Sequence, residues 1–198
     1  MSTRAEILAH AVRAVRPIVI GAADADLASA TPYRQWRLAE LAQHTLGTLA
    51  GLARLGRREA LDADDPWGTR TSEEPWSPRL VVRLDDLAEA WSAEGSWEGQ
   101  VDMGGSSMPA PMVGDMVVAE VLLHGWDLAR ATGQRFQVSD EVAKELRRGI
   151  EETAEMGRQM GAYGPAVVVG DDATDLDRAL GAAGRDPGWS PGTSPSVD

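Results

Sequence analysis

The chain of 198 residues contains no cysteine. This excludes a disulfide framework, a thiolate metal ligand and a cysteine nucleophile, so any thiol chemistry would need a thiol supplied from outside. Positive charge is also scarce, with 19 Lys and Arg against 31 Asp and Glu, a formal net charge of −12 and a pI of about 4.7. We therefore expect neither nucleic acid nor an anionic membrane surface as a partner.

Long apolar runs are absent too, and the N-terminus lacks the basic and apolar regions of a signal peptide. We therefore expect no membrane-spanning segment and a cytoplasmic protein. Apolar residues make up 43% of the chain, which is enough for a core, and the length corresponds to one domain. We expect this domain to span residues 1–189. The Ser-, Pro- and Gly-rich residues 190–198 are expected to be a disordered tail.

Apolar residues recur at helical spacing along most of the chain. The pattern predicts helices at residues 3–21, 31–55, 80–93, 114–134, 139–161 and 173–183. A loop is expected at 62–79, where two tryptophans would fold back over the body. Polar and apolar residues alternate roughly over 96–103, which predicts a short strand or hairpin. The predicted fold is all-α: a four-helix bundle with short extra helices and a small hairpin.

The helix predicted at 114–134 carries the clearest chemistry. Glu120 and His124 are four residues apart, so they share one face of the helix. A buried carboxylate costs free energy unless its charge is compensated, and a divalent metal would do this with imidazole and carboxylate ligands. The alternative is a simple hydrogen-bonded pair on the surface. Gly114 and Asp115 are expected to cap this helix, and Gly133 to follow its last turn.

Histidine is rare, with His10, His44 and His124 as the three examples. His44 falls inside the apolar stripe of the helix predicted at 31–55, where a satisfied core histidine is the alternative to a ligand. If this helix packs against the Glu120 helix, three ligands meet inside a bundle. Three protein ligands leave one coordination position open, as in a catalytic zinc site.

Two segments carry a family resemblance. TPYRQWRLAELAQHTLG (31–47) and AEVLLHGWDLARATGQ (119–134) resemble the two signatures of the DinB-like, mycothiol-dependent maleylpyruvate isomerase superfamily. GRDPGW (184–189), preceded by AYGPAVVV, resembles the C-terminal end of a short metal-binding branch. The resemblance implies a DinB-like bundle in which His44, Glu120 and His124 bind a divalent metal, usually zinc and sometimes nickel.

Isomerases of this superfamily carry an extra C-terminal domain that supplies a catalytic arginine, and we expect this chain to lack it. Arg185 is a candidate substitute, although we favour a structural wrap of the GRDPGW segment around the bundle end. Asp127 is a second candidate. It is expected either to hydrogen-bond a ligand imidazole or to make a packing contact.

The leading functional hypothesis is a metal-dependent thiol transferase or isomerase that acts on a small electrophile, with mycothiol as co-substrate. A bound metal would lower the pKa of the thiol and give a thiolate at neutral pH. The first alternative is a hydrolase that uses metal-bound water. The second is a metal-binding bundle without turnover. Bundles of this kind often pair through apolar helix faces, so a homodimer is also considered.

Overall fold

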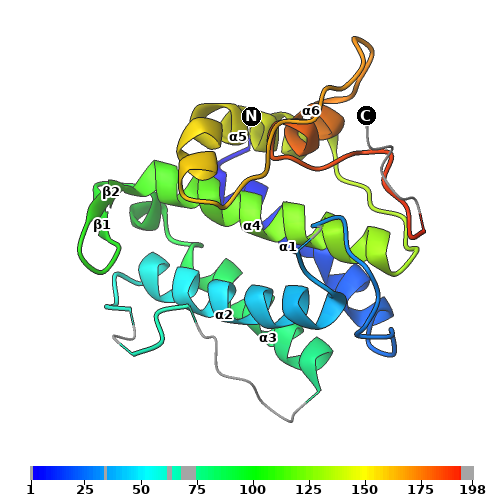
Figure 1. Cartoon of the computed structure of the whole chain (residues 1–198). Helices are drawn as coiled ribbons and strands as arrows, with labels where there is room; N and C mark the ends of the chain where they lie inside the picture. The colour runs from blue at the N-terminus through cyan, green and yellow to red at the C-terminus, as the bar shows by residue number, and fades with distance from the viewer. Residues whose placement is uncertain (1, 34, 62–63, 68–74, 193–198) are drawn as a thin grey trace.

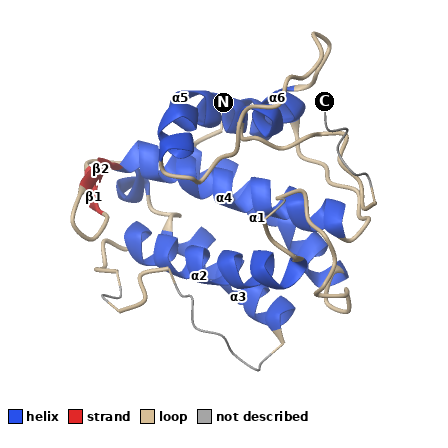
Figure 2. Cartoon of the chain, in the orientation of Figure 1, coloured by secondary structure: helices blue, strands red, loops and turns tan. Residues whose placement is uncertain are grey.

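The computed structural model describes residues 2–192 except 34, 62–63 and 68–74. Within these residues it contains six α-helices, one short 3-10 helix and one two-stranded hairpin (Figure 2). In chain order they are α1 (Arg4–Gly21), α2 (Leu38–Gly56), α3 (Trp76–Ala90), η1 (Glu94–Trp97), β1 (Gln100–Asp102), β2 (Ser107–Pro109), α4 (Ala110–Ala131), α5 (Asp140–Gln159) and α6 (Asp175–Ala182). The predicted all-α class is confirmed. A small hairpin is present, but it spans 100–109 and not the predicted 96–103, whose first two residues belong to η1.

Helices α1 to α4 form the bundle, because α1 and α2 each pack against both α3 and α4. Helix α5 covers α4 and α1 from outside, and α6 packs on α5. Figure 1 shows the resulting layers, with α5 and α6 above α4 and α1, and with α2 and α3 below. One continuous apolar core joins the layers. None of the helices in the described part of the chain has the length and apolar character that crossing a bilayer requires.

The helices predicted at 3–21 and 139–161 begin at the predicted positions. The Thr3 hydroxyl accepts a hydrogen bond from the backbone N–H of Glu6, and the Glu6 carboxylate accepts one from the backbone N–H of Thr3. This capping box starts α1. Ser139 accepts from the backbone of Val142 and starts α5. Pro17 lies inside α1 without ending it.

The start of α2 differs from the prediction. Thr31 does not cap the helix, because its hydroxyl donates to the carbonyls of Tyr33 and Trp36 and closes a separate loop. The helix begins seven residues later at Leu38, where the backbone N–H of Arg37 donates to the Glu40 carboxylate over 2.6 Å. Residues 31–33 and 35–37 therefore lie outside the helix, and Trp36 contacts His44 of α2 and His124 of α4.

The start of α4 also differs, since the helix begins at Ala110 and not at the predicted Gly114–Asp115 cap. Gly114 lies inside the helix, and the ring of Trp97 packs directly on it. A Cβ at this position would lie 2.2 Å from Trp97 Cζ3. At the other end, Gly133 follows the last turn with φ of +67°, as predicted.

Three smaller predictions concern the ends of other segments. Helix α3 begins at Trp76, inside the predicted loop 62–79, of which 62–63 and 68–74 lie outside the described residues. Trp67 does lie against Gly51 of α2, so this part of the loop folds back over the body. Met160, inside the helix predicted at 139–161, instead follows the last turn of α5 and is 67% exposed. Residues 193–198 of the expected tail are also outside the described residues.

Candidate metal centre

Helices α2 and α4 bring three side chains from distant parts of the sequence together. One ligand atom from each of His44, Glu120 and His124 lies within 4.8 Å of the other two. Glu120 Oε2 is central, with His124 Nε2 at 3.1 Å and His44 Nε2 at 3.5 Å. The two imidazole rings are edge to face, with centroids 4.9 Å apart.

These separations suit a common metal ion. Zinc ligands lie at about 2.0–2.2 Å in a tetrahedral arrangement, which places neighbouring ligand atoms about 3.3 Å apart. The observed 3.1 and 3.5 Å bracket this value. Glu120 Oε2 is buried and has no correctly oriented hydrogen-bond donor among the described residues. Because an unsatisfied buried oxygen is costly, the donor set fits a divalent cation between the three side chains.

One side of this centre reaches the surface. The side chains of His44 and Glu120 are 33% and 26% exposed, whereas that of His124 is 7% exposed. The buried hydroxyl of Thr48 lies 3.4 Å from His44 Nε2, a long contact. A fourth ligand, such as water or a substrate, could therefore approach past His44 and Glu120.

The other side of His124 is sealed by an ion pair. Asp127 is fully buried, and its Oδ2 lies 3.1 Å from His124 Nδ1, so of its two expected roles the structure shows the hydrogen bond to the imidazole. Arg185, 2% exposed, donates to both carboxylate oxygens of Asp127 over 3.0 and 3.3 Å and to the carbonyl of Ala183. Arg185 thus connects the GRDPGW segment to His124 through Asp127.

An aromatic pair from the loop 31–37 covers the imidazoles. The ring of Trp36 lies 4.4 Å from that of His44 and 5.9 Å from that of His124. Tyr33 packs on Trp36, and the guanidinium of Arg185 lies 5.7 Å from the Tyr33 ring centre. The helix predicted at 31–55 included Trp36, so the sequence did not indicate this contact, which depends on the loop before α2.

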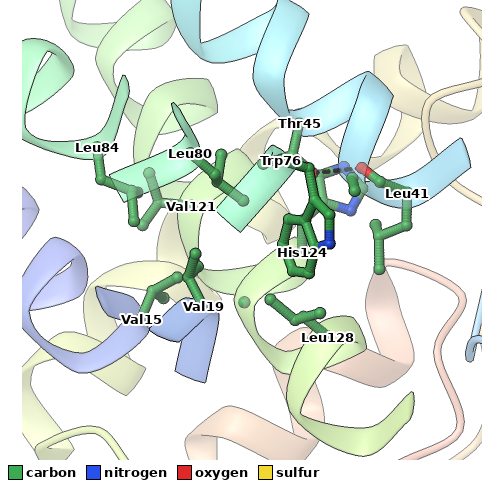
Figure 3. Close-up of a pocket in the computed structure, with 12 residues that line it drawn as sticks. Val15, Val19, Leu41, Thr45, Trp76, Leu80, Leu84, Val121, His124 and Leu128 are labelled. Atoms are coloured by element: carbon green, nitrogen blue, oxygen red, sulfur yellow. Dashed lines mark hydrogen bonds between the residues drawn. The ribbon is translucent and has the colours of Figure 1, made fainter. Parts of the chain in front are cut away.

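A small cavity borders His124 on the bundle side (Figure 3). Its volume is about 10 Å³, roughly that of one water molecule, and its walls are almost entirely apolar. The lining residues come from α1 to α4: Val15, Val19, Leu41, Ala42, Thr45, Trp76, Leu80, Leu84, Val121, His124, Gly125 and Leu128. This side packs against the imidazole and is too small for a substrate, so access is left to the side of His44 and Glu120.

The electrostatics of the cluster favour a positive charge at its centre. Burial alone would lower the pKa of His124, but the charge of Glu120 and the hydrogen bond to Asp127 raise it to about 9. Burial alone would raise the pKa of Glu120, yet the proximity of His124 and then of His44 holds it well below its usual range. Burial, followed by the charge of Glu120, raises the pKa of the Tyr163 hydroxyl to about 12.

Comparison with known proteins gives two kinds of likeness, although no family model matches the chain. Two uncharacterized Mycobacterium tuberculosis proteins, MT0763 and Rv0738, are each 27% identical over 124 residues. This match spans 60% of the chain and only 62% of the length of either relative.

The second likeness is structural. The fold matches crystal structures of the mycothiol-dependent maleylpyruvate isomerase, with a TM-score of 0.58, and of a histidine-to-alanine mutant of that enzyme, with a TM-score of 0.60. Each alignment covers 96% of this chain and 85% of the isomerase at 15% identity. The DinB-like fold expected from the two sequence signatures is therefore confirmed.

Proposed function

We propose that this chain binds a divalent metal through His44, Glu120 and His124 and uses it to activate a small-molecule thiol. The thiol would be transferred to a small electrophile, or would assist its isomerisation, and the chain would belong to the mycothiol-dependent maleylpyruvate isomerase superfamily. The observation that carries this proposal is the buried Glu120 oxygen, which lies between two imidazole nitrogens without a correctly oriented donor among the described residues.

Two further observations support a thiol as the reactant. The solved structures with the same fold are those of an isomerase named for its dependence on mycothiol. The chain itself has no cysteine, so a sulfur nucleophile would have to come from a separate molecule. We therefore propose mycothiol as co-substrate, with zinc as the metal and nickel as the alternative.

We assign a different role to each group of side chains around the centre. His44, Glu120 and His124 would hold the metal, which when bound would lower the pKa of a thiol and supply a thiolate at neutral pH. Asp127 fixes the His124 ring through Nδ1, so that Nε2 faces Glu120. Trp36 packs against both imidazoles and would restrict their movement. The side chains of His44 and Glu120 are partly exposed, so we propose that both reactants approach from this side.

The test is a reaction of zinc-reconstituted protein with mycothiol and a panel of electrophiles that includes maleylpyruvate, analysed by mass spectrometry. We expect thiol conjugation or isomerisation that requires both metal and thiol. The variant His44→Ala should abolish it. The matched control His10→Ala, which removes a histidine of α1 outside the cluster, should leave it unchanged.

Two other outcomes would contradict the thiol reaction. Turnover of ester or amide substrates without thiol would indicate the hydrolase that uses bound water. Zinc binding without turnover of any substrate in the panel would indicate a metal-binding bundle that is not an enzyme.

A further inference from the structure

We infer that Arg185 is a positioning residue for the metal centre, acting through Asp127 to hold His124 with Nε2 turned toward Glu120 and His44. This inference rests on the metal site of the proposed function. It assigns Arg185 of the GRDPGW segment (184–189) a role in metal affinity, although Arg185 is not one of the three candidate ligands.

Arg185 is buried, and each of its guanidinium nitrogens donates a hydrogen bond within the protein. Its guanidinium is 2% exposed and donates to Asp127 Oδ1 over 3.3 Å, to Asp127 Oδ2 over 3.0 Å and to the Ala183 carbonyl over 3.1 Å. A buried charge is retained only when it is paired and hydrogen-bonded, and the planar guanidinium fits a carboxylate with two parallel contacts. A segment that merely covered the bundle end would not need a buried cation here.

Asp127 transmits this constraint to the ligand. Its Oδ2 accepts from both Arg185 Nη2 and His124 Nδ1, at 3.0 and 3.1 Å, so the orientation of one carboxylate sets that of the imidazole. With Nδ1 occupied in this way, His124 presents Nε2 to Glu120 Oε2 at 3.1 Å. Partners of ligand histidines typically change metal affinity by ~10–100-fold when they are removed.

The segment that carries Arg185 is itself tightly placed. Gly184 has φ of +80° and passes against Gly164, whose backbone atoms would lie 2.8–2.9 Å from a Cβ at Gly184. Farther along, Arg130 of α4 donates to the carbonyls of Pro187 and Trp189. Arg130 thus anchors the backbone of the same segment, whereas Asp127, among the described residues, is hydrogen-bonded by the side chains of Arg185 and His124. Arg130 therefore provides a matched control.

The test measures zinc affinity by competition with a chelating dye. The proteins are wild type, Arg185→Lys, Arg130→Lys, Asp127→Asn and the double variant Asp127→Asn with Arg185→Lys. Lysine keeps the charge and loses the two-contact geometry, so Arg185→Lys should weaken zinc binding by ~10-fold. Arg130→Lys should leave the affinity unchanged. In the Asp127→Asn background, Arg185→Lys should cause no further loss, because the constraint passes through Asp127.

A result that differs from any of these three expectations overturns the inference. It is wrong if Arg185→Lys binds zinc as wild type does, if Arg130→Lys weakens binding equally, or if Arg185→Lys is as harmful in the Asp127→Asn background as it is in wild type. If wild type binds no zinc, the metal site and this inference fail together. If wild type binds zinc and Arg185→Lys matches it, only this inference fails.

A second measurement uses wild type alone and does not depend on a variant folding. Coupling between two sites is reciprocal, so zinc at the centre should steady the segment that positions His124. We expect zinc to slow hydrogen exchange of the Arg185 amide, which donates to the Leu180 carbonyl, and of the Trp189 amide, which donates to the Asp186 carbonyl. Unchanged exchange at both amides would contradict the coupling.

Discussion

The two sides of His124 differ in how their polar groups are satisfied. Toward Glu120 and His44 the side chains are partly exposed, and the central carboxylate oxygen has no correctly oriented donor among the described residues. Toward Asp127 and Arg185 they are sealed from solvent, and both groups are hydrogen-bonded. One imidazole therefore joins an open, incomplete set of ligand atoms to a closed, complete ion pair.

This difference separates binding from support. The open side has a carboxylate oxygen without a hydrogen-bond donor among the described residues, and its side chains are partly exposed. These are the properties of a site that takes up a cation. On the closed side both carboxylate oxygens of Asp127 accept hydrogen bonds. We therefore expect this side to orient the His124 ring and to stabilise the fold. Each prediction below tests whether the two sides play these separate roles.

The largest effect on stability is expected at the closed side. Asp127→Asn leaves the buried guanidinium of Arg185 without its charged partner, and breaking a buried pair in this way costs about 3–5 kcal/mol of unfolding free energy. Urea denaturation of the metal-free protein measures it. The control Asp86→Asn removes the partner of Arg57 in a half-exposed pair and should cost about 1 kcal/mol or less. Equal losses in the two variants would contradict a structural role for the closed side.

The next effect is a pH dependence of the metal-free protein. Because Glu120 and Asp127 raise the pKa of His124 from 6.5 to about 9, its contribution to stability is full below pH 6.5 and is lost as the pH rises through 9. The loss is on the order of 3 kcal/mol. Urea denaturation in chelator at pH 6.5 and at pH 9.5 measures it. The decline should be absent in His124→Gln, and an equal decline in that variant would assign it to other groups.

The smallest effect is expected at the open side. Thr48→Val removes the hydroxyl that lies 3.4 Å from His44 Nε2. Since this contact is long, we expect a change of about 1 kcal/mol or less in unfolding free energy. The same denaturation measurement serves as the check. A loss comparable to that of Asp127→Asn would show that hydrogen bonding holds the open side as firmly as the closed one.

The sequence indicated those parts of the site that depend on local spacing. Glu120 and His124 share a helix face by their interval, and the rarity of histidine pointed to His44. The parts it did not indicate depend on tertiary contacts. Trp36 reaches the imidazoles because Thr31 closes a loop in place of capping a helix. The pairing of Arg185 with Asp127 joins residues 58 positions apart, which no periodicity reports.

The helix boundaries show the same division. Thr3 and Ser139 start helices through hydrogen bonds to their near neighbours, so the sequence predicted them correctly. Gly114 resembled a helix start, but it is a glycine because Trp97 packs against it inside α4. A packing reason for a glycine cannot be distinguished from a capping reason without the fold.

The most direct test of the metal centre is the metal content of purified, zinc-reconstituted protein, measured by elemental analysis beside His44→Ala, His124→Ala and the control His10→Ala. We predict one tightly bound zinc per chain in wild type and in His10→Ala, and none in the other two variants. Wild type without zinc, or His44→Ala and His124→Ala with the same zinc content as wild type, would contradict a metal site at His44, Glu120 and His124.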